Sequence, residues 1–190
     1  MPVVDRGQVT LNVRQGDTPI VQIREFDIGC TPSPSVPAET LLADGWKTYL
    51  LFWAVSKEVG EAGFLADLGV AVLECQGCVA SMFGYPNDEG IVEHAFYMYG
   101  MSDLASSVLE VVDSPWVLEV TQQMRASASR IWGARGMGSS WSRDSTLRHF
   151  ILTLKEKTFE CLVYDRIAID RFFPTFDEAF AHVLSKFKEH

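Results

Sequence analysis

Residues 148–164, with the sequence RHFILTLKEKTFECLVY, decide the fold that the chain can adopt. Two mostly apolar segments, 148–154 and 158–164, flank a polar turn over residues 155–157. Successive side chains along a strand point to opposite faces, so alternate positions of each segment share one apolar face. The pattern predicts a β-hairpin with one buried face. The side chains predicted to face the core are Phe150, Leu152, Leu154, Phe159, Cys161 and Val163.

Other segments predict further strands around this hairpin. Residues 46–55, WKTYLLFWAV, are apolar on both faces and predict a central strand that is covered on both sides. Residues 69–83 predict a long strand, and residues 57–68 a loop or short helix. Three prolines within residues 31–39 indicate an exposed connector, because proline neither continues a helix nor donates to a sheet. Shorter strands are predicted at 8–14, 19–28 and 107–112.

A mid-chain helix is predicted from its first residues. Ser114 is a suitable N-cap, and Pro115 suits the first helical position because its missing N–H would be unpaired there anyway. Apolar residues then recur at helical spacing, which predicts a helix over residues 115–128. Residues 129–146 are rich in Gly, Ser and Arg and show no periodicity, so they predict a long mobile loop.

The C-terminal segment predicts the second helix. Thr175 and Glu178 form a capping box, and an apolar stripe at helical spacing follows, so we expect an amphipathic helix over residues 176–188. Strands outnumber helices, and short turns link many of them. We therefore expect residues 1–190 to form one globular α+β domain: a mainly antiparallel β-sheet with the C-terminal amphipathic helix and the mid-chain helix packed on it.

Length and composition limit the classes of function. The 190 residues are enough for one domain with a sizeable core. No apolar run reaches the roughly 18 residues that span a bilayer, and the N-terminus lacks a secretory signal, so we expect a cytoplasmic protein that does not bind membranes. The net charge of −9 disfavours nucleic-acid binding and favours a basic protein partner. A homo-oligomer remains open, because the strand at 46–55 needs cover on both faces.

Positive charge is concentrated in one segment. Between Arg125 and Arg148 there are five arginines and one acid, so this segment carries +4 and the remainder of the chain −13. The sequence GARGMG at residues 133–138 lacks the ending and the strand-loop-helix setting of a phosphate-binding loop. We interpret the segment as a solvated loop, with binding of an anion or acidic peptide by its arginines as the alternative.

The cysteine pair in CQGC, Cys75 and Cys78, is better explained by packing than by chemistry. It lies within a predicted strand and not at the start of a helix, where a redox pair is activated. Zinc would need two further ligands, and no second CxxC or HxxxH is present. The two thiols should face opposite sides of the sheet unless Gly77 makes a bulge. We expect structural thiols, no metal and no cofactor.

No catalytic signature is found. Of the four histidines, His94 and His149 are the credible bases, because His190 is terminal and His182 lies on the polar face of the last helix. The chain has no GxSxG elbow, and no spacing rule pairs a cysteine with either histidine. We therefore favour a protein that is not an enzyme.

The turn GYPNDE at residues 84–89 is the main candidate for a binding contact. Proline presets φ, and Asn and Asp tolerate turn geometry, so the acidic side chains should be presented at the surface. The spacing of its acids matches no calcium-loop template. The candidate binding residues, from this turn and its expected neighbours, are Tyr85, Asn87, Asp88, Glu89, His94, Arg135, Arg148 and His149.

Three motifs resemble a family of small uncharacterised bacterial proteins. They are FGYPNDE at residues 83–89, the junction with Trp116, and the hairpin with LRHFI at 147–151 and TFEC at 158–161. The resemblance spans roughly residues 70 to 165 and implies one compact domain with no known activity. The family pattern has His-Pro after the acidic turn and His-Asp at the hairpin tip, where this chain has Ala95 after His94 and Lys155-Glu156.

Two hypotheses of function follow. The first is a cytoplasmic binding or interaction protein that uses its acidic surface, with the GYPNDE turn as a contact. The alternative is a small enzyme or ligand-binding domain whose site combines that turn, His149 and the arginine-rich loop. The alternative predicts a pocket in which Asp88, His149 and one of the arginines converge.

Overall fold

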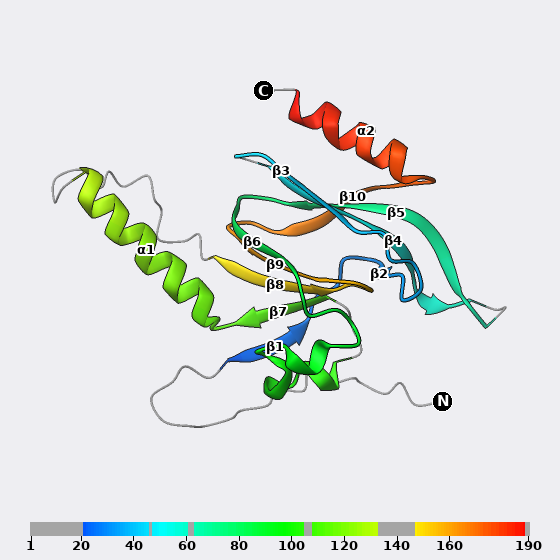
Figure 1. Ribbon diagram of the computed structural model, residues 1–190, viewed down its shortest axis with the longest axis horizontal. Coiled ribbons are helices and arrows are strands. Elements are labelled where there is room, and N and C mark those ends of the chain that lie inside the picture. Colours follow the sequence, from blue (N-terminus) through cyan, green and yellow to red (C-terminus); the bar gives the residue numbers. More distant parts are fainter. Residues whose placement is uncertain (1–20, 46, 61–62, 105–107, 133–146, 189–190) are drawn as a thin grey trace, which may run out of the picture.

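The computed structural model describes residues 21–45, 47–60, 63–104, 108–132 and 147–188. In these residues the strands form two five-stranded antiparallel sheets, which confirms the predicted α+β class (Figure 1). The first sheet has the order β1 (Gln22–Glu25), β7 (Val108–Val112), β8 (Arg148–Thr153), β9 (Thr158–Val163) and β6 (Cys78–Gly84). The second has the order β10 (Ile167–Phe173), β5 (Leu65–Cys75), β4 (Thr48–Val59) and β2 (Thr31–Pro32), and β3 (Thr40–Ala43) also pairs with β4.

The main core lies between the two sheets. Phe150 and Phe159, from the hairpin at 148–164, are fully buried there against Leu50 and Phe52 of β4. This confirms the predicted hairpin and its core-facing side chains. The expectation of a single buried face is wrong, because Ile151 and Leu162 on the other face are also fully buried. A fully buried Leu or Phe side chain stabilises a fold by about 1.5–3 kcal/mol, so this layer is the main source of stability.

Helix α2 (Phe176–Phe187) covers the outer face of the second sheet (Figure 1). Ala179 and Val183 of the helix are fully buried against Tyr49 and Leu51 of β4. Thr175 caps the helix, because its Oγ1 accepts a hydrogen bond from the Glu178 N–H at 3.3 Å. Both faces of β4 are therefore covered within one chain, as the sequence of this strand predicted.

Two bent segments connect the sheets, and each consists of two consecutive strands. In the first segment β5 lies in the second sheet and β6 in the first. In the other segment β9 lies in the first sheet, paired with β6, and β10 in the second, paired with β5. Gly77 has a φ of 65° at the bend between β5 and β6, where a residue with a side chain would be strained. Because of this bend, Cys75 and Cys78 both contribute to the core between the sheets. The exception stated for Gly77 therefore applies, and the two thiols do not lie on opposite faces.

The outer face of the first sheet is covered by the segment between β6 and β7. This segment contains three short 3₁₀-helices, η1 (Ile91–Glu93), η2 (Tyr97–Tyr99) and η3 (Met101–Asp103). Ile91, Phe96 and Met101 pack on Leu109 and Ile151 of the sheet. The segment is thus held by apolar contacts, although the sequence pattern predicted no element there.

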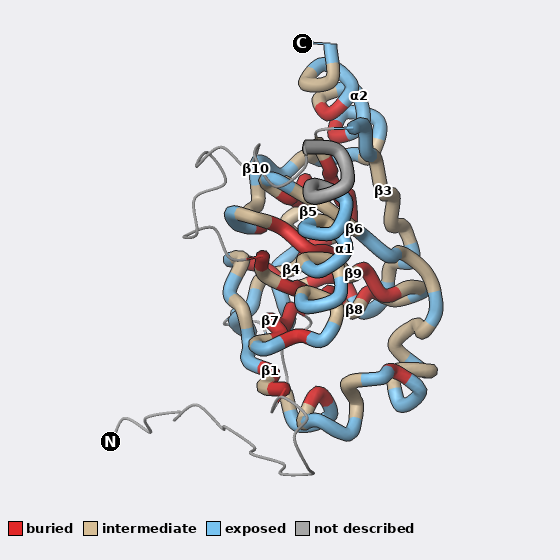
Figure 2. Tube along the Cα trace, turned by 90° about the vertical axis from the view of Figure 1, so that its left-hand side faces the viewer, coloured by how far each residue is buried: buried red, intermediate tan, exposed pale blue. Residues whose placement is uncertain are grey.

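Helix α1 (Pro115–Trp132) begins where predicted and continues four residues beyond the predicted end, since the residues before Gly133 contain no helix breaker. It reaches the protein core near its start, where the Trp116 ring lies 5.2 Å from the His149 ring. Its described side chains are otherwise largely exposed, as Figure 2 shows. In the described residues no helix combines the length and hydrophobicity that crossing a bilayer requires.

Three local predictions differ from the structure. Residues 57–68 were expected to be a loop or short helix, but β4 and β5 extend into this segment as a hairpin. The connector at 31–39 is not fully exposed, because Pro32 and Ser33 are buried where β2 pairs with β4. β10 was not predicted. The predicted strand at 8–14 and residues 133–146 of the predicted loop lie outside the described residues.

Candidate functional site

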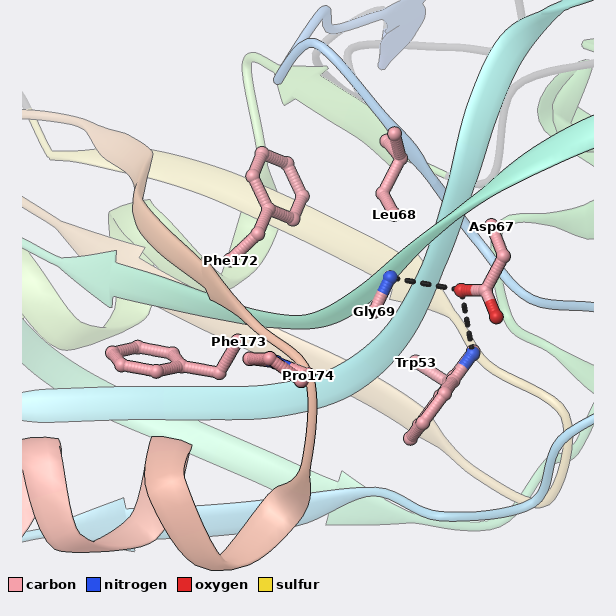
Figure 3. A pocket seen from close by; sticks show the side chains of 7 residues that line it. All are labelled: Trp53, Asp67, Leu68, Gly69, Phe172, Phe173 and Pro174. Atoms are coloured by element: carbon pink, nitrogen blue, oxygen red, sulfur yellow. Dashed lines mark hydrogen bonds between the residues drawn. The ribbon is translucent and has the colours of Figure 1, made fainter.

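Two of the cavities in the described part of the chain are candidates for a site. The larger, about 460 Å³, lies beside the ends of β5 and β10 (Figure 3). Its carboxylate, Asp67, already accepts hydrogen bonds from Trp53 Nε1 at 2.9 Å and from the Gly69 N–H at 2.8 Å. The other side chains lining this cavity are apolar. The hydrogen bonds of Asp67, its one charged group, stabilise the local structure of β4 and β5. We therefore place the candidate site at the other cavity.

The second cavity has a volume of about 340 Å³ and lies over the outer face of the first sheet. The GYPNDE turn, the segment around η1 and η2, the start of α1, and strands β6, β8 and β9 all contribute to its walls. It combines aromatic side chains with a group of titratable ones. The lining residues are Met82, Tyr85, Pro86, Glu93, His94, Ala95, Phe96, Trp116, His149 and Glu160.

A chain of hydrogen bonds forms the base of this cavity. Ser114 Oγ lies 2.8 Å from His149 Nδ1, and His149 Nε2 lies 2.9 Å from Glu160 Oε2. The other oxygen, Glu160 Oε1, lies 3.3 Å from His94 Nε2. The side chains of His149 and His94 are only 1% and 4% exposed, whereas that of Glu160 is 14% exposed. Glu160 is thus the member of the chain most accessible from the cavity.

The sheet register brings these groups together. His149 on β8 and Glu160 on β9 both point outward, because each neighbours a core residue in sequence. Glu160 pairs with Ile151, so His149 is its diagonal neighbour on the same face. His94 follows η1, and its Nδ1 accepts a hydrogen bond from the Phe96 N–H at 3.2 Å. Three distant segments therefore converge on one carboxylate.

Glu160 is ionised at neutral pH. Burial would raise its pKa, but hydrogen bonds from His149 and His94 lower the pKa to about 2. An ionised carboxylate can only accept hydrogen bonds, so both histidine Nε2 atoms carry protons. His94 Nδ1 accepts from the Phe96 backbone amide, and His149 Nδ1 is hydrogen-bonded to the Ser114 hydroxyl. The Glu160 carboxylate therefore brings a negative charge to the base of the cavity.

The order serine, histidine, carboxylate is that of a catalytic triad, but its geometry is not suited to nucleophilic attack. Ser114 is only 2% exposed and does not line the cavity. Its Oγ also accepts a hydrogen bond from the Val117 N–H at 3.4 Å, as an N-cap of α1. The serine therefore anchors His149 and the helix. The arrangement holds Glu160 ionised and fixed in position.

Aromatic rings form the walls above this carboxylate. Phe96 and Trp116 present their rings edge-to-face to His149, at 5.7 and 5.2 Å between centroids. Tyr85 is 70% exposed at the cavity mouth. Its hydroxyl is hydrogen-bonded to Glu93, which raises the pKa of Tyr85. The lining thus contains two carboxylates and, within the described residues that form it, no lysine or arginine.

The GYPNDE turn is fixed to the β8–β9 hairpin. Lys155 Nζ donates to Asp88 Oδ2 at 2.9 Å, and Thr158 Oγ1 donates to the Pro86 carbonyl at 2.6 Å. Within the turn, Asn87 Oδ1 accepts from the Gly90 N–H at 2.9 Å. These contacts hold the turn in one conformation beside the cavity.

The structure brings together three of the sequence-predicted site residues, since Tyr85, His94 and His149 all line the cavity. Asn87, Asp88 and Glu89 belong to the turn beside it, but they are not lining residues. Asp88 and His149 therefore do not share a pocket wall, contrary to the convergence that the alternative hypothesis requires. Arg135 lies outside the described residues.

Arg148 does not belong to the site, because consecutive residues of a strand face opposite ways. It points away from the cavity and binds Glu110 with its Nε at 2.8 Å and its Nη2 at 3.0 Å. Arg24 binds the same carboxylate at 2.6 Å. Burial opposes ionisation of Glu110, but the two arginines lower its pKa, so this group is a structural ion cluster.

Glu160, Phe96, Trp116 and the role of Ser114 in the site were not predicted from the sequence. Glu160 did carry a signal, because it is a charged residue inside a strand whose other positions are mostly apolar. Such a residue needs a partner, and His149 lies on the same predicted face of the neighbouring strand. Phe96 and Trp116 carried no comparable signal, since aromatic residues most often serve as core.

Other chemical sites are not supported. In the described residues no group of three or more His, Cys, Asp or Glu side chains is arranged to hold a metal ion. Burial raises the pKa of Cys78 and raises that of Cys30 to about 12, which disfavours reactive thiolates. Comparison of the chain with protein-family models, curated proteins and solved structures finds no match.

Proposed function

We propose that this is a binding protein that holds a positively charged organic group in the cavity above Glu160. The observation that carries the proposal is the pairing of an ionised, fixed carboxylate with walls of Tyr85, Phe96 and Trp116. Aromatic ring faces attract cations, and a preformed carboxylate supplies the opposite charge without reorganisation. A net charge of −9 adds long-range attraction for a cation.

The shape and chemistry of the cavity support a cation with an apolar stem. Its volume of about 340 Å³ lies at the lower end of the range for small-ligand sites. A carboxylate has about four acceptor positions, and the two histidines use one on each oxygen, so Glu160 keeps acceptor capacity toward the cavity. Met82, Ala95 and Phe96 provide apolar surface for the stem.

Calorimetric titration with butylguanidinium and butylammonium tests the proposal, with neutral butylurea as the isostere. For ligands of this size we expect a Kd of about 1 mM for the cations. Butylurea should bind at least about tenfold more weakly, which corresponds to about 1.4 kcal/mol. Equal binding of butylurea and butylguanidinium would overturn the proposal.

Two variants locate the binding in the cavity. Glu160→Gln removes the central charge, and Tyr85→Ala removes an exposed wall without disturbing the core. Glu89→Gln is the matched control, because Glu89 carries the same charge on an 81% exposed side chain that does not line the cavity. We expect weaker cation binding in the first two variants and unchanged binding in the third. If Glu89→Gln weakens binding as much as Glu160→Gln and Tyr85→Ala do, the attraction is not specific to the cavity.

A further inference from the structure

Exposed apolar side chains are frequent in the segments that line this cavity. Five of the twelve large apolar side chains that are exposed in the described part of the chain lie between residues 82 and 99. Met82 and Tyr85 line the cavity itself, and the ring of Tyr99 contacts that of Phe96 at 6.2 Å between centroids. Val92 and Met98, which are 58% and 83% exposed, flank the lining residues in sequence. We call these five side chains the apolar rim.

The three rim side chains that do not line the cavity, Val92, Met98 and Tyr99, are not explained by a small ligand. A small-molecule site buries most of its ligand within the cavity, so side chains outside the mouth gain nothing from it. In protein interfaces, by contrast, a central pocket takes an anchor side chain, and surrounding contacts exclude water from it. Methionine suits such a surface, because its flexible thioether adapts to the partner. Two of the five rim residues are methionines.

The charges beside the cavity favour a basic partner. Glu93 lines the mouth and Glu89 is largely exposed nearby on the turn. Lys155 lies 2.9 Å from Asp88 and 3.8 Å from Glu89, so three acids, Asp88, Glu89 and Glu93, stand against one lysine here. An excess of negative charge around a binding pocket increases the association rate of a positively charged partner. The contacts of Asp88, Pro86 and Asn87 hold the turn in place before binding, which reduces the entropy lost on association.

We propose that the cavity and its apolar rim form the docking site for a basic protein segment that inserts an arginine side chain between apolar neighbours. This inference rests on the cation binding proposed above. Arginine fits better than lysine, because its planar guanidinium stacks on aromatic rings and loses less hydration on burial. Its aliphatic stem would lie against the apolar lining, and the residues beside it would cover the rim.

A heptapeptide library displayed on phage, with a fixed central arginine and six random positions, tests this inference. Selection on the wild-type protein should enrich apolar residues next to the arginine. Synthetic copies of the selected peptides should bind at least about tenfold more tightly than butylguanidinium, because rim contacts add to the anchor. Replacement of the central arginine by citrulline should abolish that binding.

Matched surface variants identify the rim as the source of the gain. Val92→Ser and Met98→Ser should each weaken peptide binding at least about threefold and leave butylguanidinium binding unchanged. The controls are Val59→Ser and Phe64→Ser, which alter apolar side chains of comparable exposure, 63% and 78%, on the β4–β5 hairpin. These controls should bind the peptides as the wild type does.

The outcomes separate the two proposals. If the selected peptides bind no more tightly than butylguanidinium, or if the Val92 and Met98 variants bind like wild type, the cavity takes a cation but the protein partner is wrong. If butylguanidinium itself fails to bind the wild-type protein, the proposed function fails and the inference fails with it. Enrichment of apolar residues next to the arginine, together with weaker peptide binding by the Val92 and Met98 variants, supports both proposals.

Discussion

At the scale of single residues, Ser114 illustrates how one side chain connects structure and site. Its Oγ accepts from the first turn of α1 and bonds to His149 Nδ1, so it fixes both the helix start and the histidine that orients Glu160. A cap alone contributes about 1 kcal/mol. A buried histidine nitrogen that loses its partner costs about 1–3 kcal/mol more.

We therefore expect Ser114→Ala to lower the free energy of unfolding by about 2–4 kcal/mol, measured by urea denaturation. Thr175→Ala is the matched control, because Thr175 caps α2 but is exposed and has no buried histidine partner. Its expected cost is about 1 kcal/mol. If the two variants lose the same free energy of unfolding, the hydrogen bond from Ser114 to His149 contributes nothing beyond the helix cap.

At the scale of elements, the pairing of β5 with β10 depends on a glycine. Gly69 has a φ of 83°, and a Cβ at this position would collide with the carbonyl oxygen of Phe173. Gly29 has the same φ of 83° but open space around it. Each glycine N–H also bonds to an aspartate two residues earlier, Asp67 or Asp27. The two positions thus differ mainly in the close approach of a neighbouring strand.

This comparison predicts two different costs. Gly29→Ala should destabilise the protein by about 1–2 kcal/mol, the cost of a left-handed conformation for a residue with a Cβ. Gly69→Ala should cost at least about 2 kcal/mol more, because the collision involves backbone that can only move by shifting β10. Thermal or urea unfolding of both variants measures the difference. If the two variants lose a similar free energy of unfolding, β10 can shift away from the new Cβ without destabilising the protein.

At the scale of the whole molecule, buried carboxylates make stability depend on pH. The folded pKa of Glu160 is about 2, against 4.5 for an unperturbed side chain. Because the folded value is lower, the stability that Glu160 contributes is present above about pH 4.5 and is lost as the pH falls toward 2. The difference corresponds to about 3 kcal/mol. The lowered pKa values of Glu110 and Asp170 act in the same direction.

We expect the free energy of unfolding to decrease between pH 5 and pH 2.5, measured by urea denaturation at each pH. Glu160→Gln should be less stable at neutral pH, because its amide cannot accept from both histidines. Its stability should then change less over the acid range, by up to about 3 kcal/mol, since the variant has no carboxylate to protonate at this position. If Glu160→Gln loses as much free energy of unfolding between pH 5 and pH 2.5 as the wild type does, the low pKa of Glu160 is contradicted.

The sequence alone predicted those elements whose periodicity or capping signal lies within a few neighbouring residues. The 148–164 hairpin, the strand at 46–55 and the start of each helix were predicted from patterns within a few residues. The site was predicted only in part, because it depends on which strands become neighbours. His94 and His149 were recognised as bases, but their shared partner Glu160 follows from the β8–β9 register together with the docking of the segment after η1. Arg148 was assigned to the site for its charge, although it precedes His149 in a predicted strand, where alternation places consecutive residues on opposite faces.

The paired bends that carry β5 into β6 and β9 into β10 have a consequence for sequence change. Residues 76–77 hydrogen-bond directly to residues 164–166, so the two corners are built against each other. An insertion in one corner alone would shift one long strand against its partner and place core side chains on the wrong face in one sheet. Variation in length at these corners is therefore expected to occur in both or in neither.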